Sequence, residues 1–348
     1  MLQNEIANKT CVKSEQRDNS LDVARGIAII LVVMGHIWTG GLFHEWIYSF
    51  HMPLFFIITG LVGNWRCARF QDLVEKIWKN VKRYVVPYFL MMMFAGEASI
   101  NNIIKYAFAS RIVLGDYPLI AKWFLPCLFV ASSYVITIIF LIERMLLDET
   151  KNKVGFLSTS VVFFIGGQIF DGVRCGNNNP WMWNVAIMGA FFIMLGMLMK
   201  KGWWIIGTIP LSQISVWGGV SAFLSLFFFR KVVPNDFGMT MVAGDYGDPF
   251  YFLVAALSGS FFILFIGIIL KDISFLKFIG KNTLTIMIFH GLFLEDALFR
   301  VESHGKWCEF AFVMTGCIAV IILKSLFESN SDLNLGNLVK RHKEKSIK

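Results

Sequence analysis

The sequence predicts an all-α, polytopic membrane protein. Of its 348 residues, 56% are hydrophobic and only 16% are charged, and the mean hydropathy is +0.62. A soluble domain of this composition would have to expose too much apolar surface. The apolar residues form continuous runs of about 20, the length of a bilayer-spanning helix, and lack the alternation of an outer-membrane β-barrel. A bundle of transmembrane helices is therefore expected.

About ten of these runs are predicted to span the membrane. They cover residues 21–40, 46–63, 84–99, 123–143, 154–171, 182–199, 203–229, 250–270, 283–299 and 308–326. The run 203–229 is the least regular, because it is long and contains Pro210 and a Gly218-Gly219 pair. It is predicted either as one kinked helix or as one span with a re-entrant piece.

The predicted membrane domain covers residues 21–326, between a polar tail at 1–20 and a basic tail at 327–348. Lysine and arginine residues are concentrated in alternate connecting segments, so the positive-inside rule favours a cytosolic location for both termini. The first apolar run lacks a small-residue cleavage site and is expected to be a retained span. The expected location is a bacterial inner membrane.

The charge and the cysteines exclude two other classes. The net charge of +8 is sorted by membrane side and does not form the contiguous basic face of a nucleic-acid-binding protein. The six cysteines are scattered without a C-x-x-C pair, so no metal site is expected. Cys175 and Cys308 fall in or beside segments predicted to be outside, where they are either a disulfide or two free thiols.

The first predicted span carries three ionisable residues, Asp22, Arg25 and His36. Such groups are costly in a bilayer, so each indicates a functional site or a specific structural role. Arg25 and His36 are 11 positions apart, which places them on one helix face about 16 Å apart along the axis. A structural role stays open for each of the two residues. Arg25 would be a snorkelling anchor that pairs with Asp22, and His36 would be a packing residue that bonds to a neighbouring span.

Two further histidines fall in predicted spans. His51 lies at the outer end of the second span, and the short connection brings it to the same leaflet as His36. His290 lies in the middle of the ninth span, where a packing or network role is the more common one. The remaining histidines are interpreted as ordinary loop or tail residues: His44, His304 and His342.

Five sequence blocks follow one another along the chain. They are Leu21–Ala28 with His36, Phe50–Gly60 (FHMPLFFIITG), Trp123–Phe129 (WFLPCLF), Tyr246–Pro249 (YGDP) with Gly259, and Ile279–Thr283 (IGKNT) with His290. In this order the blocks resemble acyltransferase family 3, a family of membrane O-acyltransferases, and the first is similar to the R-x10-H pattern of that family. The FHMPLFF variant is closest to the fucose 4-O-acetylase-like branch.

The resemblance implies an O-acetyltransferase that moves an acetyl group from cytosolic acetyl-CoA to a hydroxyl of a polysaccharide or lipid-linked glycan. Arg25 would hold a phosphate of CoA, and His36 would be the general base, a task suited to histidine near pH 7. His51 would orient the acceptor or His36, or would carry the proton outward. Lys79, Lys82 and Arg83 in the connecting segment 64–83 are either further CoA ligands or ordinary positive-inside charges. The family's usual paired arginines are absent there.

Two other functions fit the composition. A proton-coupled secondary transporter also has many spans with buried Arg and His, but it predicts an inverted internal repeat, and none is visible. A purely structural membrane protein would leave the shared face of Arg25 and His36 unexplained.

Overall fold

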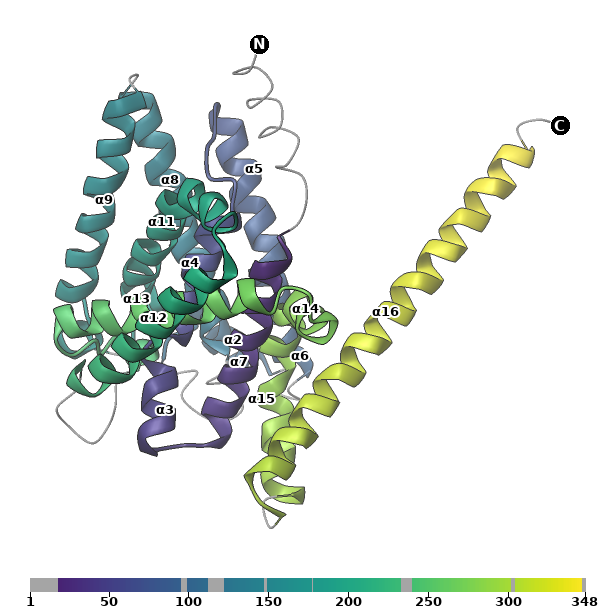
Figure 1. Ribbon diagram of the computed structural model, residues 1–348. Coiled ribbons are helices and arrows are strands. Elements are labelled where there is room, and N and C mark those ends of the chain that lie inside the picture. The colour runs from purple at the N-terminus through teal and green to yellow at the C-terminus, as the bar shows by residue number, and fades with distance from the viewer. Residues whose placement is uncertain are drawn as a thin grey trace.

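The protein is described by a computed structural model at residues 18–94, 99–111, 122–146, 149–176, 178–232, 240–301 and 304–345. These residues form a bundle of α-helices, with α3 at one end, α5 at the other and α16 projecting from the side (Figure 1). The helices are α2 (Asn19–Ile37), α3 (Gly41–Tyr48), α4 (His51–Val62), α5 (Phe70–Asn80), α6 (Val86–Phe94), α7 (Ile100–Phe108), α8 (Phe124–Met145), α9 (Glu149–Ile169), α10 (Gly172–Cys175), α11 (Trp183–Ile206), α12 (Leu211–Val232), α13 (Pro249–Ile269), α14 (Ser274–Lys281), α15 (Thr283–Arg300) and α16 (Lys306–Lys345).

Seven segments of the described chain are long and apolar enough to cross a membrane, which makes this a multi-pass membrane protein. They are Asn19–Ile37, Gly41–Val62, Phe124–Met145, Pro180–Ile206, Leu211–Val232, Pro249–Ile269 and Lys306–Phe327. The other three predicted spans, 84–99, 154–171 and 283–299, overlap the helices α6, α9 and α15. Those helices do not combine the required length and apolar character within the described residues. The count of ten and the cytosolic location of both termini stay predictions.

The predicted boundary between the spans 182–199 and 203–229 is wrong. Helix α11 continues through Lys200 and Lys201 to Ile206, and α12 begins at Leu211. The lysine pair does not end the helix, because Lys200 Nζ donates a hydrogen bond to the carbonyl of Gly63 at the end of α4 (2.9 Å). The break comes at Pro210, which directly precedes α12 and cannot donate a backbone hydrogen bond.

The segment 64–83, predicted as a connection, is largely helical. Helix α5 runs into a π-helical turn at Val81–Val85, which runs into α6. The three elements form one uninterrupted helical stretch from Phe70 to Phe94. Lys79, Lys82 and Arg83 therefore project from a helix and its π-turn, a local geometry that is frequent at functional sites.

Close backbone contacts between helices depend on glycine. A Cβ at Gly60 of α4 would overlap the carbonyl oxygen of Ile193, and a Cβ at Gly196 of α11 would overlap that of Ile57. Gly189, near the start of α11, lies against the Phe56 ring in the middle of α4. Lys200, farther along α11, bonds the Gly63 carbonyl at the end of α4, so α4 and α11 run parallel.

We predict that Gly60→Ala destabilises the bundle, because the added methyl group forces α4 away from α11 at a cost of about 1–3 kcal/mol. The melting temperature of the purified protein in detergent should fall by several degrees. Gly219→Ala on α12 is the matched control, since nothing lies within 4 Å of a Cβ there. Equal melting temperatures for the two variants would contradict the packing described for α4 and α11.

Candidate functional site

Helix α2 carries the two residues on which the site is built. It begins after Asp18, whose side chain accepts a hydrogen bond from the backbone N–H of Ser20 (2.8 Å) and another from Trp203 Nε1 of α11 (2.9 Å). It then continues without interruption to Ile37. Arg25 therefore lies near the first end of the helix and His36 in its last turn, as the sequence predicts.

At the first end, Arg25 forms an ion pair with Asp22 across 3.4 Å. The Asp22 side chain is only 1% exposed, whereas that of Arg25 is 21% exposed. The pairing that the sequence suggested is thus present, and part of the Arg25 side chain stays uncovered by the rest of the protein. Arg25 also interacts electrostatically with Tyr84. The guanidinium carbon of Arg83 lies 5.4 Å from the centre of the Tyr84 ring. Arg25 and Arg83 therefore share a neighbour.

The other two predicted phosphate ligands have partners of their own. Lys79 pairs with Glu75 one turn earlier on α5 (2.7 Å), and both side chains are exposed. Lys82 Nζ lies 5.8 Å from the centre of the Trp78 ring. Arg83 is thus the member of this basic group with a described link to Arg25.

The opposite end of α2 holds a cluster of four histidines and one tyrosine. Tyr48 Oη lies 3.5 Å from His36 Nδ1, and the His290 ring of α15 lies 5.3 Å from the His36 ring, with a tilt of 37°. His44 and His51 are also within electrostatic range of His36. We call these five residues the histidine cluster. Helices α2, α3, α4 and α15 each contribute to it.

Tyr48 connects three members of the histidine cluster. Its ring stacks on His44 at 3.9 Å and lies 4.7 Å from His51. His44 Nδ1 hydrogen bonds to the carbonyl of Gly35 on α2 (2.9 Å), and His51 Nδ1 to the carbonyl of Ile47 (2.8 Å). The interpretation of His44 as an ordinary loop residue is wrong, because it lies on helix α3 and contacts α2. His51 does join His36, with Tyr48 between them.

Sequence reasoning missed two residues of this region. The signal for Tyr48 was present, because positions 44, 48 and 51 follow the spacing of one helix face. Lys122 gives no local signal. Its side chain is fully buried just before α8 and close enough to His290 to interact with it electrostatically.

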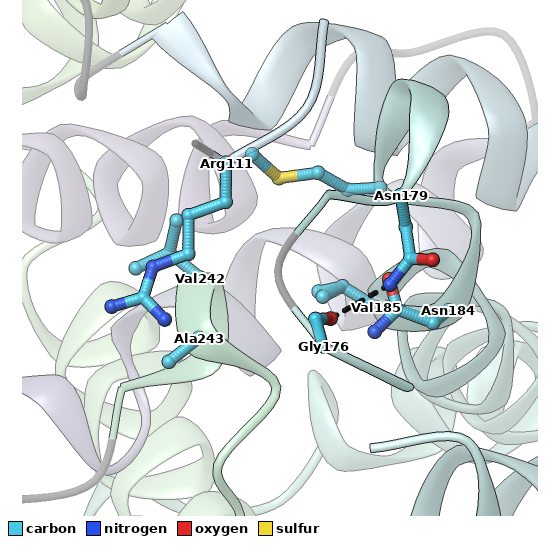
Figure 2. Close-up of a pocket in the computed structure, with 8 residues that line it drawn as sticks. Arg111, Gly176, Asn179, Asn184, Val185, Val242 and Ala243 are labelled. Atoms are coloured by element: carbon cyan, nitrogen blue, oxygen red, sulfur yellow. Dashed lines mark hydrogen bonds between the residues drawn. The ribbon is translucent and has the colours of Figure 1, made fainter. Parts of the chain in front are cut away.

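A small cavity of about 10 Å³, the space of roughly one water molecule, opens beside the start of α11 (Figure 2). It is lined by Arg111, Gly176, Asn179, Met182, Asn184, Val185, Val242 and Ala243, and Asn179 Nδ2 donates to the carbonyl of Gly176 (2.8 Å). Ligand pockets usually measure about 300–1,000 Å³, and none of the predicted site residues lines this one. The histidine cluster is a packed arrangement at the same end of the bundle.

The described residues contain no group of three His, Cys, Asp or Glu that is arranged to hold a metal ion. The histidine cluster is not such a group. Three of its imidazoles bond backbone carbonyls, and all four pack against aromatic rings. Cys175 and Cys308 are both free thiols.

The model of the family described as "Acyltransferase domain" matches residues 18–326. The match begins at the cap of α2 and ends within α16, so it contains both the Arg25 region and the histidine cluster. No curated protein matches the chain.

We predict that Asp22→Asn destabilises the protein more than Asp72→Asn. Both aspartates pair with an arginine three positions away, Asp22 with Arg25 at 3.4 Å and Asp72 with Arg69 at 3.3 Å, but Asp22 is buried and Asp72 is 29% exposed. Loss of the buried carboxylate should cost about 2 kcal/mol, below the usual range for a buried pair because Arg25 keeps contact with solvent. Equal melting temperatures would show that the buried pair does not stabilise the fold.

Proposed function

The chain belongs to acyltransferase family 3, and from this premise we propose that it transfers an acetyl group from cytosolic acetyl-CoA to a sugar hydroxyl. The acceptor is a cell-envelope polysaccharide or a lipid-linked glycan, and the enzyme resides in a bacterial inner membrane with both termini in the cytosol. The observation that carries the proposal is the placement of Arg25 and His36 at the two ends of one helix.

The reaction needs one base and no further reactant. The acceptor oxygen attacks the thioester carbonyl, a C–O bond forms, and the C–S bond breaks. His36 takes the hydroxyl proton during attack and returns it to the sulfur of the departing CoA. Tyr48, 3.5 Å from His36 Nδ1, supports this role because a partner at one ring nitrogen orients the other. His51 supports the cluster from α4 and is proposed to orient His36 or the acceptor.

Arg25 is proposed to bind the donor. Its planar guanidinium can hold a phosphate of CoA through two hydrogen bonds, and its 21% exposure leaves this surface accessible. Arg83, which shares Tyr84 with Arg25, is proposed as the second phosphate ligand. Lys79 and Lys82 are assigned to the periphery of the donor site, where their positive charge attracts the anionic cofactor.

The transporter alternative has no observation in its favour. The family match covers residues 18–326, which includes every polar residue on which that alternative relied.

Membranes containing the protein should release free CoA from acetyl-CoA only when a glycan acceptor is present, and the glycan should gain the mass of one acetyl group. His36→Ala should lower this transfer by about 10²–10⁴-fold. His36→Gln should not restore it, because an amide cannot take the proton. His304→Gln is the control. Near-normal turnover per inserted molecule in His36→Gln would end the general-base assignment.

Arg25→Lys should weaken acetyl-CoA binding by at least about tenfold, because lysine keeps the charge but loses the two-pronged contact with phosphate. The measurement is equilibrium binding of acetyl-CoA to the purified protein. Arg230→Lys, an exposed arginine at the end of α12, should bind donor normally. If Arg25→Lys also binds donor normally, Arg25 is a structural anchor at the membrane surface.

A further inference from the structure

His290 presents a hydrogen-bond acceptor to the histidine cluster. Its side chain is 1% exposed, and its Nδ1 contacts the carbonyl oxygen of Ile286 one turn earlier on α15 (2.9 Å). A carbonyl oxygen can only accept a hydrogen bond, so Nδ1 must carry the hydrogen. In the neutral ring, Nε2 then carries a lone pair and accepts.

This acceptor is not used within the protein. His290 Nε2 is buried and has no hydrogen-bond partner among the described residues. Leaving a buried polar atom unsatisfied destabilises the fold, and such atoms in native structures require an explanation. A helix-packing role is already fulfilled by Nδ1 and does not account for Nε2. The group that suits this position is a hydroxyl donor of a ligand.

The position of the His290 ring relative to His36 indicates which hydroxyl this is. The two ring centroids are 5.3 Å apart, and the ring planes are tilted by 37°. If His36 takes the proton of the reacting hydroxyl, the acceptor on His290 is near enough to meet a second hydroxyl beside the first. Sugars carry hydroxyls on adjacent ring carbons, so a pair of neighbouring acceptors in the protein is complementary to a vicinal diol.

We propose that His290 is a specificity-determining residue, which accepts a hydrogen bond from the sugar hydroxyl adjacent to the one that is acetylated. The acceptor class is therefore a sugar with a free vicinal diol. This inference rests on the proposed acetyl transfer. His290 does not exchange a proton in the reaction, and the bond changes remain those given for His36.

The test compares matched deoxy sugars. Purified enzyme receives acetyl-CoA and a panel of methyl glycosides of fucose, rhamnose, galactose, glucose and mannose, and the acetylated position is identified by mass spectrometry and NMR. For each accepted sugar, the analogue lacking the adjacent hydroxyl is compared with an analogue lacking a remote hydroxyl. A site built to bond a hydroxyl strongly rejects a substrate without it. We expect kcat/KM to fall more than about a hundredfold for the adjacent-deoxy sugar and little for the remote-deoxy control.

Two variants connect this preference to His290. His290→Phe removes the acceptor and should reduce the preference for the intact diol to below about tenfold. His290→Gln offers an amide oxygen and should retain most of the preference. These are ratios of rates for the same protein, so a change in abundance does not affect them, and the wild-type comparison requires no variant.

The outcomes separate the inference from the function on which it rests. Equal rates for the adjacent-deoxy and remote-deoxy sugars, or an unchanged preference in His290→Phe, would overturn the role of His290 while acetyl transfer stands. Absence of transfer to every sugar would overturn the proposed function, and the inference with it.

Discussion

The contact between the backbones of α2 and α14 is the constraint on which the proposed donor site around Arg25 depends. A Cβ at Gly26 would overlap the carbonyl oxygen of Leu276, and a Cβ at Gly280 would overlap that of Asp22. Small residues allow this approach where helices associate in a membrane without a strong hydrophobic drive. Because the contact lies on the turn that holds Asp22 and Arg25, it fixes the direction of the Arg25 side chain. The glycine of the IGKNT block thus has a physical role in the site.

At the other end of α2, backbone carbonyls orient the rings of three histidines. His44, His51 and His290 each bond a backbone carbonyl through Nδ1, at Gly35, Ile47 and Ile286 respectively. These bonds select the tautomer in which Nε2 is an acceptor. A polar cluster among apolar helices is stable only when such partners exist. When these rings are neutral, the protein presents several hydrogen-bond acceptors in a confined region, as the proposed binding of sugar hydroxyls requires.

The sequence predicts those features that are local along the chain. The continuous α2 with Arg25 and His36 follows from the length of the apolar run and the period of the helix. The placement of His51 in the same leaflet as His36 follows from a short connection. The same local logic failed at Lys200 and Lys201, because the Lys200 hydrogen bond to Gly63 is a tertiary contact that lets a helix continue through charges.

Features that depend on distant segments were not predictable. The 5.3 Å approach of His290 to His36 joins α15 to α2, and no spacing within either segment indicates it. The burial of Lys122 likewise depends on helices that surround the start of α8. Tyr48 is the exception, because it lies one turn after His44 on helix α3. The sequence prediction divides these two residues between a connection and the second span, 46–63, and so separates them.

This division between local and distant features bears on how such an enzyme can change its acceptor. Arg25 and His36 belong to one helix, so the distance between the proposed donor anchor and base is about 16 Å from helix geometry alone. Movements of other helices leave this distance unchanged. The position of His290 depends on the packing of α15 against α2, which substitutions elsewhere in the bundle can shift. The transfer chemistry is therefore assigned to a rigid element, and acceptor choice to a contact between elements that evolution can alter independently.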